Sequence, residues 1–186
     1  MVKKFIYKIL FPEGEGWKKR CHLVEPYIRG LDILDIGSAD PDNPSAEGKM
    51  HAWTKTVAKS SLGMDIRPPA DVIANAEDFK LDKTFDSILA GELIEHLDNV
   101  GLFLDCAYKH LKPNGKLIIT TPNAICPIYW FRTNPSCHEE HTQWHTRRTI
   151  TQILERHGFK VVYISLYGHL SYTLFVVAER VEKNVQ

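Results

Sequence analysis

The chain has 186 residues, of which 44% are hydrophobic, and its 23 basic and 23 acidic side chains give a formal net charge of zero. This length and composition support one globular domain with a sizeable core and exclude a disordered or fibrous protein. Zero net charge argues against electrostatic capture of nucleic acid, and no apolar run reaches the ~20 residues that span a bilayer.

The cysteines are irregularly spaced and form no C-x-x-C pair. They are Cys21, Cys106, Cys126 and Cys137. A disulfide framework is therefore not expected in a chain of this length, and thiols packed as small apolar side chains fit better. We expect a cytoplasmic protein.

The first part of the chain, residues 1–30, is expected to form a helical cap. Pro26 interrupts the helix that starts near Trp17. Lysines and apolar residues are interspersed at the start of this segment. A basic amphipathic helix of this kind either packs on the fold or contacts an anionic membrane surface, and both alternatives stay open here.

Strand and helix patterns alternate from Leu31 onward. Residues 31–36 are almost all apolar and predict a buried strand that ends at Gly37, after which Ser45 caps a helix. Three short strands are expected next, at 62–66, 71–74 and 85–90.

In the second half of the chain, two helices have clear boundaries. Asp98 is expected to cap the first, which residues 112–115 stop, and Thr146 opens the second, which ends at Gly158. The remaining strands are expected at 116–121, 160–166 and 171–178. Strands that alternate with helices predict a parallel α/β sheet, and the short turn between the last two strands makes that pair antiparallel.

The loop after the first strand lacks the glycines of a phosphate-binding site. Ligands of open α/β sheets bind beyond the carboxyl ends of the strands, where a dinucleotide favours G-x-G-x-x-G. The loop here reads Gly37-Ser38-Ala39 and has no third glycine. Its acids, Asp35, Asp40 and Asp42, favour a cationic ligand over a phosphate. Taken alone, this loop could also be an ordinary turn with solvated acids.

Polar residues also follow the second and third strands. Asp65 ends the second strand, where a carboxylate can accept both hydroxyls of a ribose. Asn75 and Ala76 follow the third, where an amide side chain and a free backbone N–H can recognise an adenine edge without charge. Three such positions in this order are a stronger signal than any one of them.

As a set, these motifs resemble those of class I S-adenosylmethionine-dependent methyltransferases. The matching stretches are 33–39, 62–66, 75–79, 85–97 and 111–123. The most similar subgroup has an E-x-x-E-H-L segment after the fourth strand and includes the ubiquinone-type O-methyltransferases. The resemblance implies an α/β fold, a Rossmann-like three-layer sandwich with a mostly parallel seven-stranded sheet. It also implies a single domain over 1–186, with a cofactor-binding half at 31–121 and an acceptor-side segment and C-terminal strands at 122–186.

The resemblance further implies which residues bind S-adenosylmethionine. Those expected at its methionine end are Asp35, Gly37, Ser38 and Ala39, with Ala90 and Gly91 beneath it. Those expected at its nucleoside end are Asp65 and Ile66 near the ribose, and Asn75 and Ala76 near the adenine. Two features depart from the family: Ala39 replaces a glycine, and Asp65 and Asp71 are too close for a full helix between them. We therefore expect an unusually open adenine side.

Acidic and imidazole side chains follow the fourth strand, where the acceptor would react. We expect His96 to act as general base, because imidazole titrates near neutral pH, with Glu92 and His145 as further catalytic candidates. The alternative is a His96 that only hydrogen-bonds a loop carbonyl.

Small-RNA 2′-O-methyltransferases share the E-x-x-E-H arrangement and hold a divalent metal there. A metal on Glu92, Glu95 and His96 with His141 or His145 is an alternative that we do not favour, and we assign no metal ligand. A zinc site of Cys137, His138, His141 and His145 fits the usual spacings less well.

The segment before the last helix is rich in aromatic residues, which either line an acceptor pocket or pack as a cap. They are Ile128, Tyr129, Trp130, Phe131 and Trp144. Nearby arginines suited to an anionic acceptor are Arg132, Arg147 and Arg148.

The leading hypothesis is a cytoplasmic methyltransferase that O-methylates a small-molecule, lipid or glycan acceptor. Two alternatives are a metal-assisted RNA ribose 2′-O-methyltransferase and an inactive cofactor-binding subunit of a catalytic partner. The missing glycines argue against a nicotinamide oxidoreductase. Nucleic acid is not expected as a partner, and a homodimer stays open.

Overall fold

The computed structural model describes residues 16–39, 48–127, 140–168 and 172–182. Seven strands form one sheet in the order β3-β2-β1-β4-β5-β7-β6. The strands are β1 (Asp32–Ile36), β2 (Ser60–Asp65), β3 (Val72–Ile73), β4 (Phe85–Gly91), β5 (Leu111–Pro122), β6 (Phe159–Tyr167) and β7 (Thr173–Arg180). The first five strands pair in parallel, and β7 pairs antiparallel with both β5 and β6. The predicted sheet, with its antiparallel C-terminal pair, is confirmed.

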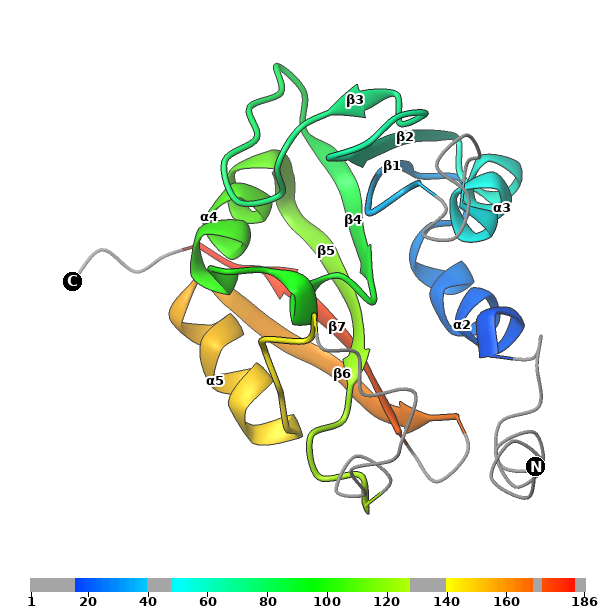
Figure 1. Ribbon diagram of the computed structural model, residues 1–186. Helices are drawn as coiled ribbons and strands as arrows, with labels where there is room; N and C mark the ends of the chain where they lie inside the picture. Colours follow the sequence, from blue (N-terminus) through cyan, green and yellow to red (C-terminus); the bar gives the residue numbers. More distant parts are fainter. Residues whose placement is uncertain (1–15, 40–47, 128–139, 169–171, 183–186) are drawn as a thin grey trace, which may run out of the picture.

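Helices cover both faces of the sheet, so the molecule has three layers (Figure 1). The α-helices are α2 (Gly16–Val24), α3 (Lys49–Val57), α4 (Val100–His110) and α5 (Arg147–Arg156), and the short 3-10 helices are η1 (Glu25–Tyr27) and η2 (Ile94–His96). In Figure 1, α4 and α5 lie on one side of the sheet, and α2 and α3 lie on the other. The Rossmann-like sandwich expected from the sequence is therefore confirmed.

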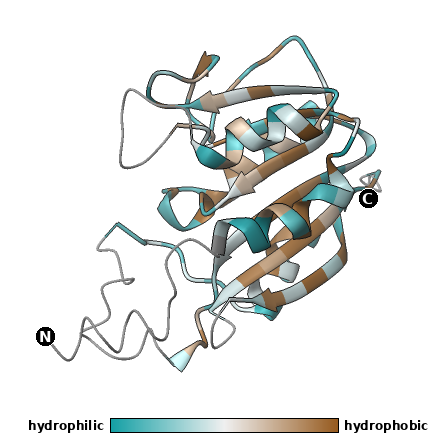
Figure 2. Cartoon of the chain, turned by 90° about the vertical axis from the view of Figure 1, so that its right-hand side faces the viewer, coloured by the Kyte–Doolittle hydropathy of each residue, from teal (hydrophilic) through white to brown (hydrophobic). Residues whose placement is uncertain are grey.

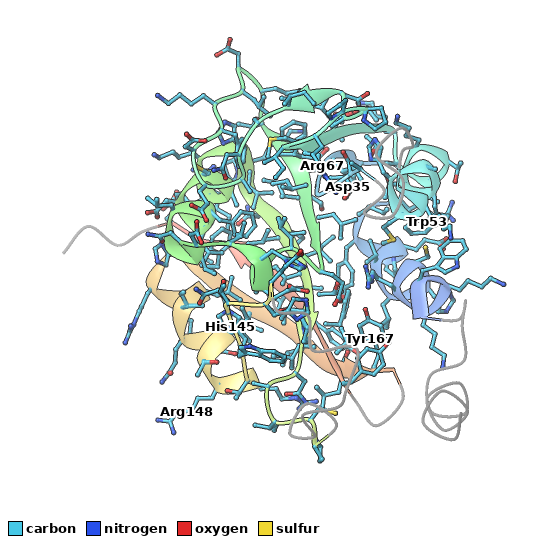
Figure 3. All side chains as sticks on the ribbon, viewed as in Figure 1. Asp35, Trp53, Arg67, His145, Arg148 and Tyr167 are labelled. Carbon is cyan, nitrogen blue, oxygen red and sulfur yellow. The ribbon has the colours of Figure 1, made fainter. Side chains whose placement is uncertain are left out.

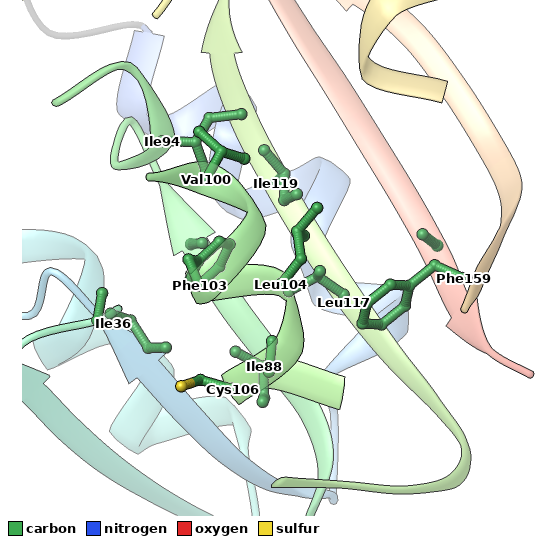
Figure 4. Close-up of a cluster of buried hydrophobic side chains, with 14 of the residues drawn as sticks. Ile36, Ile88, Ile94, Val100, Phe103, Leu104, Cys106, Leu117, Ile119 and Phe159 are labelled. Atoms are coloured by element: carbon green, nitrogen blue, oxygen red, sulfur yellow. The ribbon is translucent and has the colours of Figure 1, made fainter. Parts of the chain in front are cut away.

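The core follows from the alternation of side chains along each strand. Figure 2 shows apolar residues concentrated along the strands. One set faces α4 and α5 and packs with Phe103 and Leu104, as Figure 4 shows. The other set, which includes Ile33, Leu89 and Ile118, packs with Val24 of α2. Because both faces of the sheet are buried, its strands are nearly continuous apolar runs, which is why they could be predicted from the sequence.

Helix ends show where local prediction succeeded. Thr146 caps α5 as predicted, with a reciprocal capping box to Thr149. Gly158 follows that helix with a φ of 86°, a conformation that glycine adopts without strain. The prediction that Asp98 caps α4 is wrong, because the side chain of Asn99 accepts the hydrogen bond from Leu102 N at 3.1 Å.

Other boundaries differ by a few residues. The helix α4 ends at His110, before the predicted stop at 112–115, since Leu111 already pairs with Phe85 of β4. The N-cap of α3 is Gly48, and the predicted cap Ser45 lies outside the described residues. The strand β3 has two residues rather than the predicted four, because it pairs with β2 only through Met64 and Asp65.

The connection from β2 to β3, whose residues are all described, contains no helix, as the sequence predicted. Within the described part of the chain, no helix is long and apolar enough to cross a membrane. The basic segment at the start of the chain, for which membrane contact was left open, lies outside the described residues. The division into cap, cofactor half and acceptor segment stays a prediction.

Candidate active site

The loop after β1 runs close to the end of β2. Gly37 has a φ of 84°, which glycine adopts without strain, and its N–H donates to Met64 O at 2.8 Å. Ser38 N also donates to Met64 O, at 3.2 Å, and Ser38 and Ala39 are buried. Because Gly37 has no side chain, a ligand at this edge of the sheet can contact its backbone directly.

Asp65 connects that loop to the end of β2. One carboxylate oxygen, Oδ2, accepts from Ala39 N at 3.1 Å, and the other, Oδ1, accepts from Arg67 N at 3.1 Å. Each carboxylate oxygen has a second lone pair, so Asp65 can accept further hydrogen bonds. Beside it, Ile66 is 68% exposed, which leaves an apolar side chain available to a ligand.

The candidate adenine residues differ in exposure. Asn75 is exposed, and its Oδ1 accepts from Glu77 N at 3.0 Å, so this oxygen already has a partner in its own loop. Ala76 is buried at 6% exposure and packs in the core. The side chain of Asn75 keeps its amide N–H groups for a ligand, since only the oxygen is used here.

At the end of β4, Gly91 lies beside an arginine from α2 that sequence analysis did not identify. A Cβ at Gly91 would lie 3.5 Å from Nη1 of Arg20. Arg20 Nη2 lies 3.3 Å from Glu92 Oε1, and Arg20 Nε donates to the hydroxyl of Tyr167 at 3.1 Å. Glu92, a catalytic candidate on the sequence pattern, is thus engaged in an ion pair with a neighbouring helix. Nothing in the local sequence around Arg20 or Tyr167 predicts this contact, because 147 residues separate the two.

Glu95 is the most buried acid of the region, at 1% exposure. Thr121 Oγ1 donates to its Oε2 at 3.0 Å. Burial, together with the nearby charge of Glu92, raises the pKa of Glu95 to about 9. The Glu95 carboxyl is therefore neutral at pH 7 as long as no cation lies beside it.

Two histidines complete a cluster with Glu95. One ligand atom from each of Glu95, His96 and His141 lies within 4.8 Å of the others. The rings of His96 and His141 meet edge to face, with centroids 4.7 Å apart. A carboxylate and two imidazoles fit a divalent transition metal, so these residues could hold one. Of the residues in the alternative metal site, the structure brings together Glu95, His96 and His141, while Glu92 pairs with Arg20.

His145 is not part of this cluster. It is 7% exposed, and among the described residues neither ring nitrogen has a hydrogen-bond partner. Its backbone bridges to Asn123 at the end of β5, and Figure 3 shows it between α5 and the sheet. Burial lowers the pKa of His145, so the imidazole is neutral at pH 7 and one of its two ring nitrogens can accept a proton.

This burial predicts a pH-dependent stability. In the unfolded chain, His145 has an ordinary imidazole pKa of about 6.5, whereas in the folded chain its pKa is lower. Below the unfolded pKa, protons therefore bind the unfolded chain more readily, and the free energy of unfolding falls as the pH falls. We expect the free energy of unfolding to fall less between pH 7.5 and pH 5 in His145→Asn than in the unsubstituted chain. Urea denaturation at both pH values measures this, with the exposed His22→Gln as control. Equal pH dependence in all three proteins would contradict the prediction.

Most of the predicted aromatic pocket, Ile128 to Phe131, lies outside the described residues, as do Arg132, Cys137 and His138. Trp144 is 39% exposed, and its Nε1 donates to His141 O at 3.2 Å, next to the cluster. Arg147 and Arg148 are exposed, and Arg148 points away from the fold (Figure 3). Trp144, whose ring meets that of His141, therefore lies beside the candidate reaction centre.

Sequence comparisons relate the chain to methyltransferases. A family model described as a methyltransferase domain matches residues 9–164. A ubiquinone biosynthesis O-methyltransferase from Nitrobacter winogradskyi is 36% identical over 103 residues, covering 54% of this chain and 34% of that protein. The mitochondrial ubiquinone biosynthesis O-methyltransferase of Rattus norvegicus is 49% identical over 119 residues, covering 52% of this chain and 32% of that protein. The chain thus spans about a third of the length of these relatives.

Solved structures extend the similarity to nearly the whole chain. An S-adenosylmethionine-dependent methyltransferase from Archaeoglobus fulgidus has a TM-score of 0.70 at 19% identity, covering 95% of this chain and 99% of that one. The 1,6-didemethyltoxoflavin-N1-methyltransferase of Burkholderia thailandensis, solved with S-adenosylhomocysteine, has a TM-score of 0.69 at 12% identity, covering 97% and 87%. Identities this low show the fold alone.

The family model covers most of the chain. The chain belongs to the methyltransferase domain family, and the prediction of a class I S-adenosylmethionine-dependent methyltransferase, similar to the ubiquinone-type O-methyltransferases, is confirmed.

Proposed function

We propose that this chain transfers the methyl group of S-adenosylmethionine to a hydroxyl of a small-molecule acceptor. The observation that supports the proposal is that the Gly37 loop is hydrogen-bonded to the end of β2, which carries Asp65, while Glu95 and His96 follow directly after the end of β4 at Gly91. The names of the sequence relatives favour oxygen as the acceptor atom and a quinone-like small molecule as the acceptor.

We propose that the cofactor residues bind S-adenosylmethionine in two ways, by hydrogen bonds and by close contact with the backbone of glycines. The Asp65 carboxylate would accept hydrogen bonds from the ribose hydroxyls. Because these hydroxyls are neutral, the charge of the carboxylate would still be compensated by the backbone N–H groups of Ala39 and Arg67. Gly37 and Gly91 would let the methionine portion approach the backbone. The G-x-G-x-x-G motif of a phosphate-binding loop is not needed, because S-adenosylmethionine carries no phosphate.

The reaction is an in-line displacement, in which the enzyme mainly positions the two reactants. The sulfonium–methyl bond breaks as the oxygen–methyl bond forms, and the cofactor leaves as a neutral thioether. The acceptor hydroxyl gives up its proton, and a nearby base accelerates the step. His96, exposed at the end of η2, is our first candidate base, and the buried neutral His145 is the second.

We propose as a second candidate a metal-assisted version of the same transfer. Glu95, His96 and His141 would hold a divalent cation, which would lower the pKa of a bound acceptor hydroxyl. A chelator separates the two candidates. Treatment with EDTA followed by desalting should abolish transfer, and added Mn²⁺ or Zn²⁺ should restore it, if the metal is required. Unchanged transfer leaves His96 or His145 as the base.

A direct test is methyl transfer from radiolabelled S-adenosylmethionine to a panel of catechols and phenols, with bulk RNA as a parallel substrate. Transfer to a catechol supports the proposal. Transfer to RNA alone would favour the alternative of a ribose 2′-O-methyltransferase. Cofactor binding without any transfer would favour the alternative of an inactive subunit that supports a catalytic partner.

We also propose a cytoplasmic location. Its support is that Cys21, Cys106 and Cys126 are buried free thiols, as expected in a reducing compartment. A homodimer stays a prediction, and sedimentation velocity would test it.

A further inference from the structure

A buried histidine, His51, lies between two aspartates in the first turn of α3. Its exposure is 2%, its Nδ1 lies 3.0 Å from Asp35 Oδ2, and its Nε2 lies 3.5 Å from Asp71 Oδ2. Figure 3 shows Asp35 at the side of the sheet that α3 covers. A buried polar side chain is costly unless it has partners, so an imidazole in this position calls for an explanation.

The two aspartates belong to segments that neighbour the proposed cofactor residues Gly37 and Asp65. Asp35 is in β1, two residues before Gly37, and its side chain contacts His51 of α3. Asp71 precedes β3, and its Oδ2 also accepts from Gly63 N of β2 at 2.7 Å. Lys55 Nζ lies 4.0 Å from the other oxygen of Asp71. The Asp35–His51–Asp71 contacts therefore join β1, α3 and the connection from β2 to β3.

The connection from β2 to β3 lacks the helix that usually packs such a segment onto the sheet. Parallel neighbouring strands are usually joined by a dozen or more residues that include a helix, which packs the connection onto the sheet. Here six residues, 66–71, join β2 to β3 and form no helix. The contacts of Asp71 with Gly63 N and His51 hold the end of this segment, and Ile66, next to Asp65, is part of it.

The first turn of α3 is also bonded to the cofactor loop. Gly48 N, at the N-cap of α3, donates to Ser38 O at 2.8 Å. There is little free space around the imidazole, since a Cβ at Gly63 would lie 2.5 Å from His51 Nε2 and 2.8 Å from Ser38 Oγ. His51 Nε2 and Ser38 Oγ thus border the same narrow space beside Gly63, so we expect a shift of His51 to displace Ser38.

We propose that His51 is a positioning residue for cofactor binding, which holds the Gly37–Ala39 loop through Asp35 and the 66–71 segment through Asp71. His51 takes over the task that a helix between β2 and β3 performs in an ordinary βαβ unit. The inference rests on the proposed placement of the cofactor between these two segments.

Substitutions at His51 separate positioning from simple stability. His51→Ala removes both contacts, whereas His51→Asn places an amide N–H near the position of Nδ1 and can still donate to Asp35. Gly63→Ala keeps every polar group and displaces the imidazole together with the Ser38 hydroxyl, so only an unchanged affinity in this variant bears on His51 by itself. His157→Asn is the matched control, because His157 Nδ1 lies 3.0 Å from Asp105 Oδ1 in the layer of α4 and α5, on the other side of the sheet.

Each protein is titrated with S-adenosylhomocysteine by calorimetry at 15 °C, and its folding is checked by circular dichroism and a thermal melt. We expect His51→Ala and Gly63→Ala to bind roughly tenfold more weakly or worse, as is typical when a residue that orients a binding group is lost. His51→Asn should recover most of that loss, and His157→Asn should bind like the unsubstituted chain.

Three outcomes would contradict the proposed role of His51 or separate it from a failure of the cofactor site. If His51→Ala melts at a lower temperature but binds with unchanged affinity, His51 only stabilises the fold and the inference is overturned. If His51→Ala does not fold, Gly63→Ala and His51→Asn decide, and wild-type affinity in Gly63→Ala overturns it. If the unsubstituted chain itself binds no S-adenosylhomocysteine, the proposed cofactor site fails first, and that result is distinct from a failure at His51 alone.

Discussion

Replacing Asp65 by alanine is expected to weaken S-adenosylhomocysteine binding by about 100-fold or more, because hydrogen bonds to a charged group contribute about 1.5–3 kcal/mol each. Two effects combine at this residue. The proposed bonds to the ribose hydroxyls are lost, and Ala39 N and Arg67 N lose the carboxylate that holds the loop in place. Calorimetric titration of the folded variant measures the effect.

The matched control is Asp82→Asn, an exposed acid just before β4 and thus near the opposite edge of the sheet. It should bind S-adenosylhomocysteine as the unsubstituted chain does. Asp65→Asn is expected to fall between the two, because an amide oxygen still accepts but carries no charge. An Asp65→Ala protein that binds with unchanged affinity would show that the ribose is held elsewhere.

Replacing His96 by alanine is expected to lower turnover by about 10²–10⁴, the usual contribution of a general base. Affinity for S-adenosylhomocysteine should stay within a few-fold, since His96 belongs to the acceptor side. The measurement is kcat with a catechol acceptor, compared with the exposed His22→Ala as control.

Turnover of His96→Ala equal to that of the unsubstituted chain would assign His96 a structural role and make His145 the candidate base. A loss of turnover together with loss of bound metal, measured by elemental analysis, would instead support the cluster with Glu95 and His141 as a metal site. The two roles of His96 are thus distinguishable in one variant.

The fold could be predicted from the sequence because its strands are buried on both faces and its loops carry strong local signals. The run 31–36 becomes β1, and Thr146 and Gly158 bound α5. The errors were local as well: Asp98 and Asn99 are adjacent residues that both favour an N-cap, and only the packing of α4 decides between them.

Parts of the site could be predicted because loops after parallel strands meet at one edge. Asp65 and Ala39, which are 26 residues apart, meet there, and so do Glu95 and His141. Arg20, Tyr167 and His51 could not be predicted, because their contacts depend on how α2, α3 and β6 pack. A lone arginine or histidine in a helix gives no local sign of a distant partner, as the ion pair of Arg20 with Glu92 illustrates.

The measurement that tests the central claim most directly is calorimetric titration of the unsubstituted chain with S-adenosylhomocysteine, with NAD as a parallel ligand. We predict saturable binding at one site with a Kd in the micromolar range and no heat from NAD. The absence of saturable binding up to millimolar S-adenosylhomocysteine would contradict a functional cofactor site at the edge formed by Gly37, Asp65 and Gly91.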